Sequence, residues 1–262
     1  MDNQQIRLNK FLAERLGISR READDAIVRG AVTVDGKKAV LGDRILIPGP
    51  QNSQNIDKNQ KVCYNNKTVP LITNYSYIAF NKPEGYVCSR KPQGDTPTIY
   101  ELLPPEYYKL KTVGRLDKDS SGLILLTNDG DFAFQMTHPK FHKEKVYEVE
   151  LNHSLAPLHQ QMISDFGVTL EDGISKFTVI TSPSNIEDGA SQIIDGQGST
   201  QKESTKKADR TIFTVILSEG RNRQIRRTFA ALGYKVVKLH RIQFGKYQLS
   251  GLKPGKYVTI KP

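Results

Sequence analysis

The order of strand-like and helix-like segments is the sequence feature that most constrains this fold. Six short runs have strand character, namely YIAFNKP, LILLT, KVYEVEL, FTVIT, TIFTVIL and KVVKLH. Four segments have helical character, namely TIYELL, DFAFQMTH, LAPLHQQMISDF and NRQIRRTFAAL. A helix does not follow every strand, as a doubly wound parallel sheet would require. We therefore predict an α+β fold whose sheet is mixed and mainly antiparallel, with flanking helices.

Residues 1–50 have the pattern of a small separate unit. A first helix has one apolar face and ends at Gly17; the face consists of Leu8, Phe11, Leu12 and Leu16. A second helix begins with Ser19 and Glu22, which have the spacing of a capping box. It is followed by a hairpin signal at Asp35-Gly36. Three arginines along the second helix could contact phosphates: Arg20, Arg21 and Arg29.

Two polar stretches suggest the remaining boundaries. Residues 51–72 are rich in Asn, Gln, Pro and Lys, which favours a linker with at most a short strand at 61–64. Residues 182–209 lie between two strand-like runs and suggest a polar insertion in a hairpin. We therefore expect the larger domain to span residues 73–262.

The positive charge of this 262-residue chain is concentrated near its end. Residues 210–262 contain 12 Lys/Arg and one acid, Glu219, whereas the chain as a whole has a net charge of +10. A localised basic surface is typical of proteins that bind a polyanion, most often nucleic acid, although it can also serve solubility.

Other features predict a cytoplasmic protein without a metal, cofactor or membrane segment, and a monomer is the default expectation. Cys63 and Cys88 lack metal-site spacing, and no apolar run approaches the length of a membrane span. His138 and His142 are four residues apart, but Pro139 interrupts the helix and no acid or cysteine completes a zinc site. RNA contact is the better interpretation of these two histidines.

The stretch TVGRLDKDSSGLILLTNDGD places Asp117 just upstream of an apolar strand. An aspartate in such a loop usually ties down a turn, and Asp119 fits that role equally well. Asp117 could instead supply a carboxylate for chemistry. Taken alone, the stretch favours the turn role for Asp117.

Two further features carry functional side chains. EGRNRQIRRTFAALG packs Arg223, Arg226 and Arg227 around a helix start that Asn222 could cap, where phosphate binding and a solvated basic face are both natural interpretations. In KEKVYEVEL, Tyr147 shares one side of the strand with Val149 and should point inward, which on this pattern alone predicts a core tyrosine.

Taken together, these motifs resemble those of ribosomal RNA pseudouridine synthases of the RsuA type, which isomerise uridine. The start of the chain resembles an S4 domain, an RNA-binding module. The resemblance continues through NKPEGYVCS, GRLDKDSSGLILLTNDG, KVYEVEL and EGRNRQIRRTFAALGYKVVKLHR. It implies a pseudouridine-synthase-type domain around a central cleft.

The resemblance also implies a role for individual residues. It makes Asp117 the catalytic aspartate, Tyr147 the residue that stacks on the base, and Arg226 the cation that pairs with Asp117. Ile225 would pack beside the pocket, and Arg115 would hold the RNA with its uridine turned out. Candidate RNA contacts are Arg20, Arg21, Arg29, Lys82, Arg221, Arg223 and Arg227.

The reaction implied is uridine isomerisation in ribosomal RNA, with small-subunit RNA slightly favoured and no cofactor or metal required. Asp117 could act as a nucleophile or as a base. The partner would be ribosomal RNA or a partly assembled subunit. The alternatives are a non-catalytic S4-type RNA-binding or ribosome-assembly protein and an N-glycosidase that uses Asp117 and Asp119.

Overall fold

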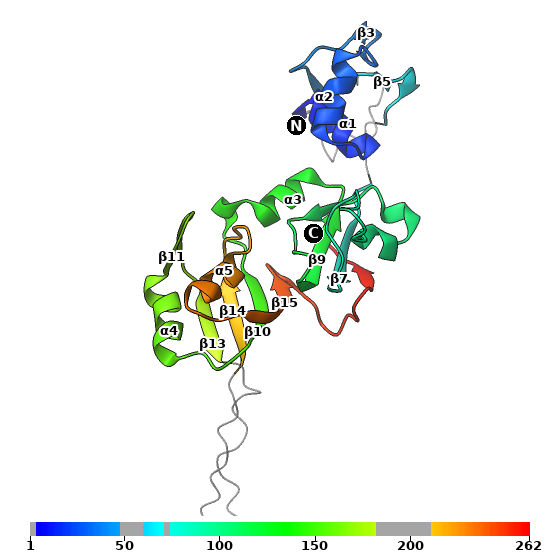
Figure 1. Ribbon diagram of the computed structural model, residues 1–262. Helices are drawn as coiled ribbons and strands as arrows, with labels where there is room; N and C mark the ends of the chain where they lie inside the picture. Colours follow the sequence, from blue (N-terminus) through cyan, green and yellow to red (C-terminus); the bar gives the residue numbers. More distant parts are fainter. Residues whose placement is uncertain (1–3, 48–59, 71–73, 182–210) are drawn as a thin grey trace, which may run out of the picture.

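The computed structural model describes residues 4–47, 60–70, 74–181 and 211–262. A small N-terminal unit lies beside a larger domain built on one extended sheet (Figure 1). The predicted insertion at 182–209 lies outside the described residues.

The N-terminal unit contains two helices and short strands. Its elements are β1 Gln4–Arg7, α1 Leu8–Leu16, α2 Arg20–Val28, β2 Val32–Val34, β3 Lys37–Lys38 and β4 Arg44–Ile47. Gly17 ends α1 with a left-handed backbone, and Ser19 and Glu22 form the predicted capping box. Asp35 and Gly36 both have positive φ in the turn between β2 and β3, which confirms the predicted hairpin.

The predicted linker at 51–72 is wrong over its described part. Strand β5 (Val62–Tyr64) pairs with β2, and β6 (Lys67–Thr68) pairs with β5. Val62 and Val69 are buried in the N-terminal core. The segment is rich in polar residues, so its sequence did not predict a strand that belongs to the N-terminal core. The strand forms because β5 pairs with β2. The N-terminal unit therefore continues to about residue 69, and the short strand expected at 61–64 is confirmed.

The larger domain contains a nine-stranded sheet whose main path runs β13-β14-β10-β15-β9-β7-β17, with β8 on β9 and β16 on β15. The strands are β7 Tyr77–Lys82, β8 Lys111–Val113, β9 Ser121–Thr127, β10 Lys145–Leu151, β13 Thr178–Thr181, β14 Ile212–Leu217, β15 Val236–Phe244, β16 Tyr247–Gln248 and β17 Tyr257–Thr259. β9 and β15 are parallel, and the other pairings described in this sheet are antiparallel. The predicted mixed, mainly antiparallel sheet is confirmed.

Helices and a small hairpin flank the sheet. They are the 3-10 turns Ile99–Leu102, Pro105–Tyr107 and Pro139–Phe141, α3 Gly130–Thr137, α4 Pro157–Gln161 with a π-helical turn Met162–Phe166, β11 Val168–Leu170, β12 Gly173–Ser175, and α5 Gln224–Ala231. The segment predicted as a helix at TIYELL is only a 3-10 turn. Asn222 does not cap α5, because the residue before the helix is Arg223 in a left-handed conformation.

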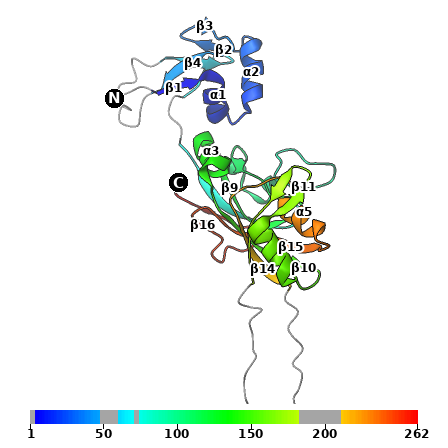
Figure 2. The same cartoon turned by 90° about the vertical axis from the view of Figure 1, so that its left-hand side faces the viewer.

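The two domains meet at the C-terminal end of α1. Arg90 donates to the carbonyl oxygen of Gly17 at 2.8 Å, and Lys111 Nζ donates to that of Ile18 at 2.8 Å. Lys10 forms an ion pair with Asp131 of α3 at 2.6 Å. Cations of the larger domain thus satisfy carbonyl groups that the end of a helix leaves free, and α3 lies close to the N-terminal unit (Figure 2).

Candidate active site

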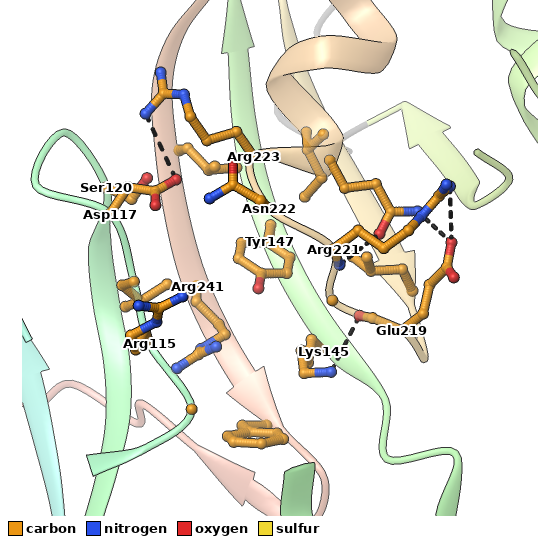
Figure 3. Close-up of a pocket in the computed structure, with 18 of the residues that line it drawn as sticks. Arg115, Asp117, Ser120, Lys145, Tyr147, Glu219, Arg221, Asn222, Arg223 and Arg241 are labelled. Atoms are coloured by element: carbon orange, nitrogen blue, oxygen red, sulfur yellow. Dashed lines mark hydrogen bonds and ion pairs between the residues drawn. The ribbon is translucent and has the colours of Figure 1, made fainter. Parts of the chain in front are cut away.

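A cavity of about 320 Å³ lies where four segments of the larger domain converge. The loop from Gly114 to Ser120 forms one wall, and the loop from Ser218 to Arg223 forms the opposite wall. Strands β10 and β15 contribute Tyr147, Lys145 and Arg241 between them (Figure 3). The lining includes five basic and two acidic side chains: Arg115, Lys145, Arg221, Arg223, Arg241, Asp117 and Glu219.

Asp117 lies in a tight turn, and its side chain faces this cavity. Its backbone carbonyl accepts a hydrogen bond from the Ser120 amide at 3.1 Å. Its carboxylate is 36% exposed and lies 3.6 Å from the Arg223 guanidinium (Figure 3). The backbone of Asp117 therefore forms the turn, while its carboxylate remains accessible for chemistry.

Lys82 holds this loop from beneath, and its assignment as an RNA contact is wrong. The residue is 0% exposed. Its Nζ donates to the carbonyl oxygens of Ser120 at 2.5 Å and Pro83 at 3.1 Å. Burial lowers the Lys82 pKa. The ammonium group binds backbone carbonyls that the loop points inward, so it cannot reach a phosphate.

Asp119 is the residue that ties the loop down. Arg223 donates to both of its carboxylate oxygens, at 3.1 and 3.0 Å. This bidentate bond is the main reason why the pKa of Asp119 lies below its usual value. Of the two neighbouring acids, Asp119 therefore performs the structural role that the sequence allowed for both.

The structure does not pair Arg226 with Asp117. The guanidinium of Arg226 donates to the carbonyl oxygens of Val236 at 2.8 Å and Asp119 at 2.6 Å, and Arg226 Nε lies 3.4 Å from the Asp119 carboxylate. Arg223 pairs with Asp117 instead. Arg223 stands just before α5 with a left-handed backbone, and its side chain lies beside the Asp117 turn. That backbone conformation cannot be read from the residue type.

Tyr147 points inward, as predicted. It is 8% exposed, and Val149 on the same side of β10 is fully buried, whereas Glu148 is exposed. Tyr147 and the buried Ile225 both line the cavity, and Arg115 is exposed at its edge. The structure thus brings four of the five residues implied by the resemblance into one cavity, and only Arg226 lies outside its lining.

Two basic residues of the cavity were not identified from the sequence. Lys145 precedes Tyr147 by two positions on β10, and its Nζ donates to the Glu219 carbonyl at 3.1 Å. Burial and, to a smaller extent, the positive charge of Arg241 lower the Lys145 pKa to about 8. Arg241 is 2% exposed, and its Nε donates to the Leu123 carbonyl at 2.7 Å. The strand period placed Lys145 on the side of Tyr147, but nothing local marked Arg241.

Arg221 and Arg227 already have intramolecular partners. Arg227 binds the Asp172 carboxylate through two bonds, at 3.1 and 2.7 Å. Arg221 binds the same carboxylate and the carbonyl oxygens of Gly173 and Ile174. Both arginines therefore hold the β11–β12 hairpin against α5, which argues against their predicted role in RNA binding.

Unlike Arg221 and Arg227, the predicted RNA contacts of the second helix are exposed to solvent. These residues are Arg20, Arg21 and Arg29.

An aromatic cluster is also exposed next to the cavity. Phe134 and Phe141 are in edge contact with ring centroids 5.8 Å apart, and Lys140 Nζ lies over both rings. Such a combination of exposed rings and a cation suits stacking of unpaired bases.

Within the described residues, no cluster of three or more His, Cys, Asp or Glu side chains could hold a metal ion. In the same part of the chain, no helix is long and apolar enough to cross a membrane.

Cys88 hydrogen-bonds the Leu116 carbonyl at 3.3 Å, and burial raises the pKa of its thiol. It therefore supports the Asp117 loop and is a poor nucleophile.

Comparisons with known proteins match both parts of the chain. Residues 76–231 match the family model described as RNA pseudouridylate synthase, and residues 6–46 match that of the S4 domain. A ribosomal small subunit pseudouridine synthase A from Pasteurella multocida is 35% identical over 257 residues, which cover 97% of this chain and 96% of the relative. The Escherichia coli K12 protein of the same name is 33% identical, covering 96% and 95%.

A solved structure described as a pseudouridylate synthase is also similar. It shares 30% sequence identity with this chain and has a TM-score of 0.61. The matched region covers 98% of this chain and 96% of the chain in that structure. The similarity therefore extends over both domains.

Proposed function

Because the chain belongs to the RNA pseudouridylate synthase family, we propose that it converts a specific uridine of small-subunit ribosomal RNA to pseudouridine. The observation that carries this proposal is the Asp117 carboxylate, which lines one cavity with Tyr147 and Ile225. The relatives' names support the choice of small-subunit RNA.

The chemistry of the reaction suits this set of side chains. The C1′–N1 bond of uridine breaks, the base turns, and a C1′–C5 bond forms, with no net oxidation. Asp117 acts on the sugar or base as a nucleophile, or it removes a sugar proton as a base. The ring of Tyr147 and the side chain of Ile225 hold the detached base by stacking and apolar packing.

The target base must leave its stack to enter the cavity. Arg115 is exposed at the cavity edge and can bind a phosphate that flanks the turned-out nucleotide, whereas Arg223 is already bound to the Asp119 carboxylate. Arg223 also lies 3.6 Å from Asp117, so it can hold that carboxylate in place as the base enters. We assign to Arg223 the pairing role that the sequence assigned to Arg226.

RNA would extend beyond the cavity in two directions. The aromatic cluster of Phe134 and Phe141 follows the edge formed by Thr137 and Pro139. The N-terminal unit adds Arg20, Arg21 and Arg29 for phosphate contacts. We propose that the partner is ribosomal RNA or a partly assembled subunit in the cytoplasm, and that the protein acts as a monomer.

The structure also bears on the two alternatives. An N-glycosidase with two acids would need Asp119, but Arg223 binds both oxygens of that carboxylate. A purely RNA-binding protein would have no need for an accessible carboxylate next to a buried tyrosine. The isomerase therefore accounts for more of the cavity than either alternative.

The test uses ribosomal RNA from a strain that lacks this protein. The RNA, free or in assembling subunits, is treated with wild type or with Asp117→Asn, and pseudouridines are mapped by carbodiimide labelling and primer extension. We expect one new stop in small-subunit RNA with wild type only. A stop with both proteins would remove Asp117 from the mechanism. Absence of any stop would favour the RNA-binding alternative, and release of free uracil would favour the glycosidase.

A further inference from the structure

The charge of Arg241 is buried without an opposite charge to balance it. Its side chain is 2% exposed, and the ion pairs found among the described residues do not include it. Its Nε donates to the Leu123 carbonyl, but one terminal nitrogen, Nη2, has no hydrogen-bond partner within the described residues. A buried cation of this kind is costly unless something completes its bonding.

A second cation lines the same cavity. Lys145 Nζ has a hydrogen bond to the carbonyl of Glu219, and the carboxylate of Glu219 is itself engaged by Arg221 and Gln224. Arg241 lowers the pKa of Lys145, which means that the two positive charges repel each other. The fold therefore holds two like charges together in a partly desolvated space, which is unfavourable unless a negative charge compensates them.

The position of this pair relative to Tyr147 indicates what it would bind. Arg241 on β15 is the register partner of Tyr147 on β10, and its guanidinium lies 6.0 Å from the tyrosine ring centroid. Lys145 lies two residues before Tyr147 on the same strand. A base that stacks on Tyr147 would therefore lie next to both cations.

Backbone phosphates fit this position poorly. They are bulky and strongly hydrated, and Arg115, an exposed cation at the cavity edge, is already available to them. The turned-out base is the part of the nucleotide that enters furthest. Its polar atoms near the tyrosine ring would be the carbonyl oxygens O2 and O4.

We propose that Arg241 and Lys145 form an anion site for the uracil ring, which stabilises the negative charge that the base acquires when its glycosidic bond breaks. The proposal rests on the isomerase function proposed above. It assigns to these residues a part in the reaction distinct from that of Asp117.

The charge balance of the step is the same for each role of Asp117 at the sugar. The C1′–N1 bond breaks, and its electron pair leaves with N1 and spreads over O2 and O4. C1′ then bonds to the Asp117 carboxylate, or it forms a C1′=C2′ double bond after Asp117 takes the C2′ proton. In the return step an electron pair from C5 bonds to C1′, either as the C1′–O bond to Asp117 breaks or as Asp117 returns its proton to C2′ and the double bond opens. The ring is then neutral, and C5 loses its proton while N1 gains one. No oxidant or reductant is needed.

This site would act mainly on the chemical step. Uridine in the ground state is neutral, and its ring becomes anionic only as the bond breaks. Cations in a desolvated cavity therefore stabilise the transition state more than the bound substrate. Loss of Lys145 or Arg241 should lower kcat and leave KM nearly unchanged.

A leaving-group comparison tests this inference. The RNA fragment that contains the mapped target is made with uridine or with 5-fluorouridine at that position. Fluorine withdraws electrons, so 5-fluorouracil leaves as a more stable anion and depends less on external stabilisation. Loss of the target nucleoside, which reports glycosidic cleavage, is measured in single turnovers with wild type, Lys145→Met and Arg241→Gln. Lys143→Met serves as control, because Lys143 does not line the cavity.

We expect Lys145→Met to lose about a hundredfold in rate on the uridine RNA, as is typical for removal of one charge-stabilising donor. On the 5-fluorouridine RNA the loss should be about tenfold smaller. Arg241→Gln should behave in the same way if its melting temperature shows that it folds, and Lys145→Met carries the test if it does not. Lys143→Met should match wild type on both RNAs.

Equal losses on the two RNAs, or a change in KM alone, would overturn the anion site while leaving the isomerase function intact. Failure of wild type to convert the uridine RNA, whether free or in assembling subunits, would overturn the isomerase function itself. The two failures are therefore distinguishable.

Discussion

Gly122 of β9 lies directly against the backbone of Arg241 of β15. A Cβ atom at position 122 would lie less than 3.0 Å from the nitrogen, carbonyl carbon and carbonyl oxygen of Arg241. Gly122 also has a φ of +105°, a conformation that side chains rarely adopt. This contact occurs where β9 and β15 run parallel, and it brings Arg241 beneath the loop that carries Asp117.

Replacement of Gly122 by alanine should therefore destabilise the larger domain. The positive φ alone costs of the order of 1–3 kcal/mol, and the clash with backbone atoms adds to that cost. We expect a clear fall in melting temperature together with a loss of kcat, because Arg241 and the Asp117 loop both shift. Gly233→Ala is a matched control, since it also has positive φ but no atom within 4 Å of its Cβ. Equal effects of the two variants would show that the close contact is unimportant.

Asp119→Asn should change activity more than stability. The substitution removes the carboxylate that binds Arg223, and Asp117 then becomes the nearest acid to that guanidinium. A tighter pair would mask the Asp117 carboxylate, so kcat should fall severalfold, while an exposed pair contributes at most about 1 kcal/mol to stability.

Asp172→Asn is the control for this variant. Asp172 forms the same bidentate bond with Arg227 but does not line the cavity. Steady-state kinetics and melting temperatures should show comparable, small losses of stability in both variants and a loss of kcat in Asp119→Asn alone. An unchanged kcat in Asp119→Asn would contradict the coupling of Asp119 to Asp117 through Arg223.

The pH dependence of kcat/KM should report on Lys145. Burial and Arg241 lower its pKa to about 8, against the opposing charge of Glu219. Because the anion site needs the protonated amine, kcat/KM should decrease as pH rises through about 8. In Lys145→Arg the side chain remains charged at these pH values, so this decrease should disappear. Its persistence in Lys145→Arg would assign the titration to another group.

The same pKa predicts an effect on stability. The Lys145 ammonium loses its proton more easily in the folded chain than in the unfolded chain, where its pKa is near 10.5. Between pH 8 and 10.5 the unfolded chain therefore binds more protons at this position, and the free energy of unfolding should increase with pH. Denaturant unfolding of wild type and Lys145→Met across this range measures the contribution, which should vanish in the variant.

The extent of the N-terminal unit predicts which truncation is tolerated. Removal of residues 1–70 should leave a folded larger domain with weaker RNA binding, since the unit carries Arg20, Arg21 and Arg29. Removal of residues 1–50 should give a less soluble protein, because Val62 and Val69 would lose the core that buries them. Gel-shift titration and light scattering distinguish the two proteins. Unchanged RNA affinity after removal of residues 1–70 would leave the N-terminal unit without a role in binding.

The sequence by itself determined the features that depend on near neighbours. The capping box at Ser19 and Glu22, the turn at Asp35 and Gly36, and the inward side of Tyr147 follow from spacing and strand period. The motif around Asp117 and its resemblance to one family gave the correct fold and reaction class. Each of these features depends only on residues close to it in sequence, so it can be predicted without knowledge of the rest of the chain.

Only the tertiary structure decided which charged groups meet. Lys82 turned inward to bind carbonyls, Arg223 replaced Arg226 beside Asp117, and Arg241 entered the cavity from a strand far away in sequence. Val62 joined the N-terminal core across a polar segment. A long basic side chain can bind a carbonyl, a carboxylate or a phosphate with similar ease, so its partner depends on which groups the fold brings within reach. That choice depends on long-range strand pairing and on the backbone conformation of single residues, which residue types alone do not specify.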